Sequence, residues 1–308
     1  MKKGELEIVK GKNDEWVVSS KQYLYDENGE MRSGKFFSII DNVYTQHGTN
    51  EMIKIMGDAK IFQYPKPSEL VRQLLLLGTN KDCLVMDFFS GSAATAQAVM
   101  QLNADDRGNR KYILVQLPEI CNETSTAFKH GYRTICEIGK ERIRRAGEKI
   151  KQENPNSNID VGFKVFRVSE TNIKWNAVEK SHDLILEDMQ YTPDLMDFTL
   201  GANDVDIVYE LMLRQRDVAL SETLEQLSDI GNRTYLYASS YLVCLETEIT
   251  VELINKLAEL DPLPIKFIFR DSAFKDDIAL KDETFRRLKA LIEKNAGTDK
   301  PAYTVEFI

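Results

Sequence analysis

The most constraining feature of this 308-residue chain is a strand–loop–helix–turn–strand pattern between residues 84 and 117. An apolar run, Leu84–Phe89, leads into a loop of small residues, and Ala94–Asn103 is typical of a helix. Residues 107–109, Arg-Gly-Asn, predict a turn, and Tyr112–Leu117 predicts a second strand. Two strands joined through a helix lie parallel, with a right-handed crossover. We therefore expect an α/β fold in which Leu84–Phe89 is a buried strand.

Three segments are expected along the chain. Residues 1–45 contain short β-rich runs and are interpreted as a β-rich lead-in, the end of a larger domain. Residues 46–155 hold the βαβ unit, and an Asn/Pro-rich linker near 154–156 separates it from a smaller α/β domain at 160–308. In that last domain we expect strands at 162–168, 234–245, 265–270 and 304–308, and helices at 204–215, 220–230, 250–260 and 282–295.

The composition excludes several classes of protein. Hydrophobic residues make up 43% and charged residues 29% of the chain, which is typical of an ordered globular protein. No apolar run is long enough for a membrane span, and the N-terminus has no signal peptide, so we expect a cytoplasmic protein without membrane contact. The four cysteines and three histidines lack the spacing of metal ligands, so no metal site is expected.

The net charge of -9 is unusual for a protein that binds nucleic acid. Residues 179–229 hold thirteen acidic and three basic residues, and we interpret this stretch as a solvated acidic surface. It is a poor surface for phosphates, so any DNA would contact another part of the protein. The charged helix predicted at 137–153 could contact phosphates. The better interpretation is a solvated face with ion pairs one turn apart, such as Glu141 with Arg145.

The loop after the first strand carries the chemistry. Backbone N–H groups at a helix N-terminus favour negative charge, and Gly91 allows close approach of a ligand to the backbone. Asp87, at the carboxyl end of the strand, can accept a hydrogen bond from a cationic group. A zwitterionic amino-acid moiety suits both partners. The alternative is a tight strand-to-helix turn whose small residues serve packing alone.

The segment Asp87-Phe88-Phe89-Ser90-Gly91-Ser92 resembles the cofactor motif of amino-methylating DNA methyltransferases. The longer string 87–119 resembles the methylation (Mod) subunit of type III restriction-modification systems. Residues 62–68, FQYPKPS, and 267–277, FIFRDSAFKDD, are similar to further segments of that family. The resemblance implies the C-terminal portion of an adenine-specific DNA methyltransferase with a partial Rossmann-like, S-adenosylmethionine-dependent fold.

The resemblance also implies a set of cofactor-binding residues. They are Asp87, Phe88, Phe89, Ser90, Gly91, Ser92, Lys66, Pro67, Gln116 and Glu119. Gln116 or Glu119, after the second strand, would contact the ribose hydroxyls, by analogy with dinucleotide-binding folds. Without the resemblance, Lys66 would be an exposed turn lysine and Glu119 a solvated acid. Ala93 and Ala94 stand where the family commonly has glycine or alanine and then threonine, which removes one hydroxyl at the start of the helix.

No catalytic residue is expected in this chain. The family's Asp/Asn-Pro-Pro-aromatic loop, which holds a flipped adenine, does not occur in the sequence. In the family's order that loop precedes the cofactor loop, so we expect a shortened chain or a split gene product that is inactive alone. DNA, through the full-length protein, and the restriction subunit are the expected partners, and a homodimer is possible.

Two alternative functions stay open. The domain after residue 160 could serve as a non-catalytic assembly module for dimerisation of the methylation subunit or for docking of the restriction subunit, which an exposed apolar patch on that domain would favour. An unrelated nucleotide-binding enzyme is disfavoured, because the sequence has neither a full G-x-G-x-x-G pattern nor a phosphate loop that ends in lysine.

Overall fold

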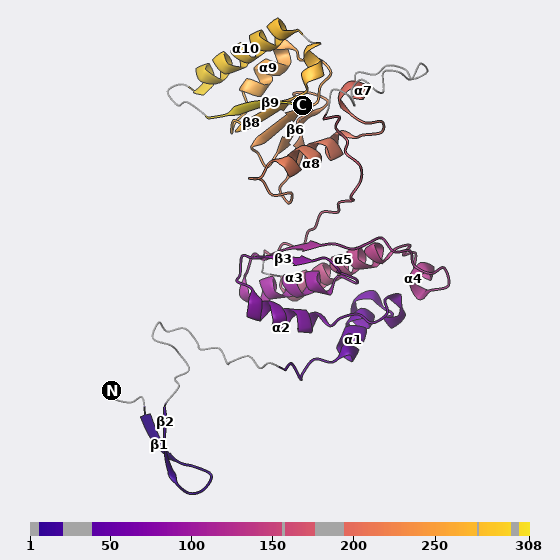
Figure 1. Cartoon of the computed structure of the whole chain (residues 1–308), viewed down its shortest axis with the longest axis vertical. Helices are drawn as coiled ribbons and strands as arrows, with labels where there is room; N and C mark the ends of the chain where they lie inside the picture. Colours follow the sequence, from indigo (N-terminus) through magenta and orange to yellow (C-terminus); the bar gives the residue numbers. More distant parts are fainter. Residues whose placement is uncertain (1–5, 21–38, 156–157, 176–193, 276, 297–301) are drawn as a thin grey trace. The chain divides into compact units, whose positions relative to one another are not determined.

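The computed structural model describes residues 6–20, 39–155, 158–175, 194–275, 277–296 and 302–308 (Figure 1). The chain divides into two units, Met1–Gly162 and Phe163–Ile308. Both units combine helices with strands, so the chain is mixed α/β, as the sequence predicts. Within the described residues, no helix is both long and apolar enough to cross a membrane.

The first unit contains a hairpin and a pair of parallel strands packed on helices. Its elements are β1 (Leu6–Lys10), β2 (Trp16–Ser20), α1 (Thr45–Met56), the 3-10 turn η1 (Ala59–Ile61), α2 (Ser68–Gly78), β3 (Leu84–Asp87), α3 (Ala94–Asp106), β4 (Lys111–Leu114), α4 (Thr126–Lys129) and α5 (Ile135–Glu153). Strands β1 and β2 pair antiparallel. Of the other β-rich runs in the lead-in, 22–25 and most of 35–40 lie outside the described residues.

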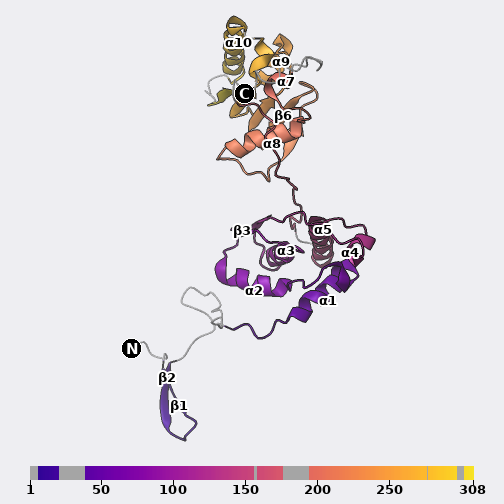
Figure 2. The ribbon, with the colours of Figure 1, turned by 45° about the vertical axis from the view of Figure 1, so that its right-hand side comes forward.

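The predicted βαβ unit is confirmed. Strands β3 and β4 are parallel, with Leu84 opposite Lys111 and Asp87 opposite Leu114, and α3 connects them. Val85 and Tyr112 face α2 and α3 and pack against a small cluster of buried residues. In both views of the chain, α2, α3 and α5 lie on the same side of β3 (Figures 1 and 2).

The expectation that Leu84–Phe89 is a buried strand is wrong. Leu84 and Met86 are each 60% exposed, and Ile113 on the neighbouring strand is 44% exposed. Side chains alternate along a strand, so these residues lie on the face opposite α2 and α3, and no described element covers that face. A continuous apolar run predicts a strand that is covered on both faces, as in most parallel sheets. The run alone does not reveal that one face is uncovered here.

The second unit is a sheet between two layers of helices. Its strands, in spatial order, are β5 (Leu224–Gln226), β6 (Thr234–Tyr237), β7 (Tyr241–Cys244), β8 (Lys266–Phe269) and β9 (Thr304–Phe307). The first three are antiparallel, and β7, β8 and β9 are parallel. Helices α9 (Val251–Ala258) and α10 (Ile278–Ala296) cover one face, and α8 (Asp204–Arg214) covers the other (Figure 1).

Two expected elements of the second unit are wrong. Residues 220–230 were expected to be a helix, because leucines at 220, 224 and 227 repeat at helical spacing, but this segment contains β5. Hydrogen bonds between β5 and β6 override the local pattern. The strand expected at 162–168 is irregular and pairs with no described strand. The strand expected at 234–245 is a hairpin, β6 and β7, that turns at Ala238 and Ser239.

Ion pairs close one end of the second unit, at the short helix α7 (Asp194–Asp197). The fully buried guanidinium of Arg270 donates to Asp197 at 2.5 Å and to Asp194 at 2.6 Å. Arg233 donates to Asp194 at 2.7 Å and to Asp204 at 2.5 Å. Burial raises the pKa of Asp194, but hydrogen bonds from the two arginines hold it below its ordinary value. The interpretation of the acidic stretch as a solvated surface is therefore wrong at these three aspartates.

Replacing Arg270 with methionine should destabilise the second unit strongly. Asp197 is 2% exposed and would lose its counter-charge. Breaking a buried ion pair on one side costs about 3–5 kcal/mol. The matched control is Lys289→Met, because Lys289 pairs with Glu293 at the surface, where such a pair contributes less than about 1 kcal/mol. Urea denaturation measures both, and equal losses in the two variants would contradict this account of the ion pairs.

Candidate functional site

The loop that follows β3 is held at both ends by one carboxylate. Asp87 Oδ2 accepts a hydrogen bond from the Thr95 hydroxyl at 2.6 Å, and its Oδ1 accepts from the Phe89 N–H at 3.1 Å. Gly91 and Ala93 both have positive φ, +49° and +64°. The loop thus turns sharply enough to start α3 directly after the strand. Thr95 supplies a hydroxyl to Asp87 although position 94 is alanine.

The end of β4 holds the middle of the same loop. The Gly91 N–H donates to Gln116 Oε1 at 2.8 Å, and the Ser90 N–H donates to the Val115 carbonyl at 3.2 Å. Three of the expected site residues, Asp87, Gly91 and Gln116, are therefore brought together. The Glu119 side chain is exposed, and its carbonyl accepts from the N–H of Ile135 at the start of α5.

Two phenylalanines of the loop present apolar surface. Phe88 is 61% exposed and Phe89 is 84% exposed, and their ring centroids lie 5.3 Å apart. Because exposed aromatic rings are costly in water, this pair is well suited to cover the planar part of a ligand.

The segment before α2 also lies against the loop. A Cβ placed on Gly91 would lie 3.3 Å from the ring of Phe62, so that ring packs on the loop backbone. Lys66 is exposed, whereas Pro67 is buried and immediately precedes α2. The structure therefore brings residue 62 next to residue 91, and it leaves the Lys66 side chain in solvent.

Ser68 belongs to the residue types that favour helix N-caps, but it does not cap α2. Helix α2 has no side-chain cap, and Ser68 is its first residue. Its N–H and its hydroxyl both donate to the carboxylate of Glu51 on α1, each at 2.9 Å. A serine that caps a helix accepts a backbone N–H, whereas Ser68 donates its N–H and its hydroxyl proton to one carboxylate, which is a strong acceptor.

A buried arginine, Arg142, links the loop after β3 to the segment before α2 through Glu51. Arg142 on α5 is fully buried and donates to Ser92 Oγ at 2.6 Å, to Gln97 Oε1 at 3.0 and 3.1 Å, and to Glu51 Oε2 at 3.1 Å. Burial lowers the pKa of the Arg142 guanidinium, and the charge of Glu51 opposes this effect. The Ser92 hydroxyl therefore faces the protein interior rather than solvent.

The interpretation of α5 as a solvated charged face is partly correct. Glu141 and Arg145 form the expected ion pair at 2.7 Å. Arg142 is the exception, because it lies on the buried side of the helix with Ile138 and Ala146. The helical spacing of those apolar neighbours was the signal that could have found it.

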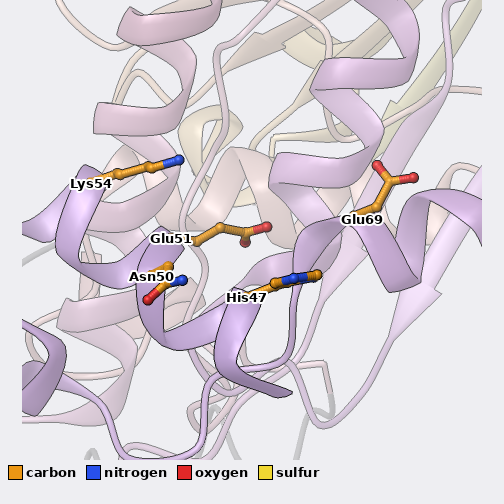
Figure 3. Close-up of a pocket in the computed structure, with 5 residues that line it drawn as sticks. All are labelled: His47, Asn50, Glu51, Lys54 and Glu69. Carbon is orange, nitrogen blue, oxygen red and sulfur yellow. The ribbon is translucent and has the colours of Figure 1, made fainter. Parts of the chain in front are cut away.

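A shallow pocket of about 210 Å³, lined by polar and charged residues, lies beside this network. Its lining residues are His47, Asn50, Glu51 and Lys54 of α1 and Glu69 of α2 (Figure 3). Glu51 belongs to both the pocket and the buried network, and its carboxylate is already engaged by Ser68 and Arg142. Among the residues that the structure describes, no three His, Cys, Asp or Glu side chains are grouped as metal ligands.

Comparisons with known proteins agree on one class. Residues 3–154 match the N6/N4 methyltransferase family, described as DNA methylase. Over 157 residues, 51% of the chain, it is 36% identical to the Mod subunit of the type III restriction-modification enzyme StyLTI of Salmonella typhimurium, and this covers 24% of that protein. Over 82% of the chain it is 32% identical to the EcoPI Mod subunit of Escherichia phage P1, covering 38% of it.

A third relative covers nearly the whole chain. Over 95% of its length, the chain is 28% identical to the EcoP15I Mod subunit of Escherichia coli, which is 42% covered. The chain thus spans less than half the length of these curated relatives.

Replacing Gly48 with alanine should destabilise the first unit. Gly48 lies in α1 against the segment before α2, and an added Cβ would lie 2.1 Å from the Pro65 carbonyl oxygen. Overpacking of this kind costs about 1–3 kcal/mol. Urea denaturation followed by circular dichroism measures the loss. The control is Gly78→Ala in α2, where an added Cβ meets nothing within 4 Å and the change should be neutral or stabilising by up to about 1 kcal/mol. Equal stability of the two variants would contradict the close packing at Gly48.

Proposed function

We propose that the first unit is the S-adenosylmethionine-binding part of a type III restriction-modification methylation subunit, because residues 3–154 match the DNA methylase family and the relatives are Mod subunits of such systems. The observation that carries the proposal is the loop 87–92, which is fixed between two parallel strands and the N-terminus of α3. The unit would then be part of a Rossmann-like methyltransferase domain. The reaction is methyl transfer to the amino group of adenine in DNA, in the cytoplasm.

The residues around the loop fit a ligand with an amino-acid moiety. Asp87 has lone pairs beyond those used by Thr95 and Phe89, and it can accept a hydrogen bond from an ammonium group. The Gly91 N–H is bound by an amide side chain, Gln116, which a carboxylate can replace as the stronger acceptor. Exposed Lys66, next to buried Pro67 in the segment before α2, would supply a positive charge to the carboxylate. These features support binding of a zwitterion.

Other residues would hold the nucleoside part of the cofactor. The exposed rings of Phe88 and Phe89 offer apolar surface for adenine, and Gln116 or Glu119 would accept hydrogen bonds from the ribose hydroxyls. Ser92 would contact the cofactor through its backbone, because its hydroxyl is bound to Arg142. Ser90 would contact it through its hydroxyl, because its N–H donates to the Val115 carbonyl. When bound, S-adenosylmethionine supplies the methyl group, and the residues named here only bind and orient it.

The base-binding elements are proposed to come from another segment. The sequence contains no Asp/Asn-Pro-Pro-aromatic tetrapeptide, so the chain has no candidate residues to hold a flipped adenine. DNA and the restriction subunit would bind the whole methylation subunit. This chain alone would therefore bind cofactor without transferring its methyl group.

A second candidate function, an assembly module, is favoured by the bare face of the β3–β4 sheet. Leu84, Met86 and Ile113 alternate with inward-facing residues and present an apolar surface on that face. Parallel sheets in α/β proteins are covered on both faces. The proposed occupant is a polypeptide that carries the remaining strands and helices of the methylase domain, together with its base-binding loop. Binding of cofactor and assembly with that polypeptide are compatible.

Calorimetric titration with S-adenosylmethionine tests the cofactor proposal. The wild-type chain should bind, and Asp87→Ala should weaken the affinity at least about tenfold, because it removes a charged acceptor. Asp105→Ala is the matched control. Asp105 lies on α3 and pairs with Arg72 near the surface, so its loss should leave the affinity unchanged. A folded wild-type chain that does not bind, or an Asp87→Ala variant with wild-type affinity, would refute the proposed site.

Transfer of a radiolabelled methyl group to mixed-sequence DNA tests the missing base-binding loop. With this chain alone, incorporation should be undetectable, because no residue of the chain is available to hold the flipped base. Robust incorporation would mean that the chain binds and orients adenine with residues of another type.

A further inference from the structure

The two segments proposed to hold the cofactor are each packed on a different helix. Helix α1 contacts residues 65–68 through Gly48 and Glu51. Helix α5 contacts the loop through Gly139 and Arg142, since a Cβ added at Gly139 would lie 3.3 Å from the Gly91 carbonyl oxygen. The spacing of the two segments therefore depends on how α1 and α5 are joined.

The joint is the ion pair between Glu51 and Arg142, at 3.1 Å. The Glu51 carboxylate accepts two hydrogen bonds from Ser68 on one side, and Arg142 donates to Ser92 on the other. A third contact, to Gln97, ties the same guanidinium to α3. One fork-shaped cation thus makes four hydrogen bonds, to the loop, to α1 and to α3, and a lysine with three N–H donors could not make all four.

The Glu51–Arg142 ion pair carries a large desolvation penalty, so it is not the most favourable way to stabilise the fold. Arg142 is 0% exposed and the Glu51 side chain 20% exposed, so both charges lose much of their hydration. Well-packed apolar residues often stabilise such a site equally well or better. The ion pair instead provides directional contacts. Each of its hydrogen bonds fixes the position of a particular atom in the loop or in the segment before α2.

We propose that the Glu51–Arg142 pair sets the distance between the loop 90–92 and the segment 66–68, with Arg142 as a positioning residue that never touches the ligand. The inference rests on the proposed function, because it assumes that both segments hold S-adenosylmethionine. A ligand that spans two segments binds tightly only where their spacing is already correct, because the protein then does not have to rearrange on binding.

The test is a double-mutant cycle on cofactor affinity, with S-adenosylmethionine as the probe in calorimetry. Arg142→Lys keeps the charge and loses the fork, and Glu51→Gln keeps the shape and loses the charge. Each should weaken binding at least about tenfold, and the double variant should lose little more than the worse single variant, because both break the same link. The matched control, Arg144→Lys, changes an exposed arginine two residues away on α5 and should stay within about twofold of wild type.

A melting curve for each variant separates positioning from mere stability. A purely structural role would lower the melting temperature and leave the affinity of the folded protein unchanged, and this result would overturn the inference. Losses that multiply in the double variant would overturn it as well. If Arg142→Lys does not fold, Glu51→Gln alone decides the test. Weaker cofactor binding by this variant supports the inference, and wild-type affinity overturns it. Failure of the wild-type chain to bind would refute the proposed function itself, whereas wild-type binding without loss in the variants refutes the positioning role only.

Discussion

A buried guanidinium must have a partner for its charge and for most of its N–H groups, and the first unit is arranged around that requirement. Arg142 finds its acceptors on α1, on α3 and in the loop after β3. The close packing of Gly48 and Gly139 on the same two segments allows the helices to approach closely enough for these contacts. Arg142 thus holds the buried side of the loop and Asp87 holds its two ends. Only the solvent-exposed side of the loop is left for a ligand.

The βαβ unit and the loop could be predicted because their signals are local. An apolar run, a small-residue loop and a helical segment follow one another within 34 residues, from position 84 to 117. Burial of the strand could not be predicted in the same way, because an apolar run does not tell whether elements elsewhere cover both faces. Arg142 was missed for a different reason. Its residue type is that of a surface helix, and only its spacing from Ile138 and Ala146 indicates the buried side.

In the second unit the errors have the same origin. The acidic stretch looks solvated in sequence, but Arg233, just before β6, and Arg270, just after β8, pair with its aspartates. The leucine spacing at 220–230 predicts a helix, yet pairing with β6 makes part of it a strand. Partners outside each segment decide both outcomes, and the pattern within the segment does not reveal them. The loop of the first unit was easier to predict, because it carries its own motif.

The measurement that tests the central claim most directly is hydrogen exchange of the whole chain with and without S-adenosylmethionine, followed by mass spectrometry. Bound cofactor should slow exchange in peptides that cover residues 62–68 and 87–93, because ligand binding stabilises the segments that it contacts. Exchange in the unit Phe163–Ile308 should stay unchanged. Protection confined to that second unit, or no protection of the loop at saturating cofactor, would contradict the account.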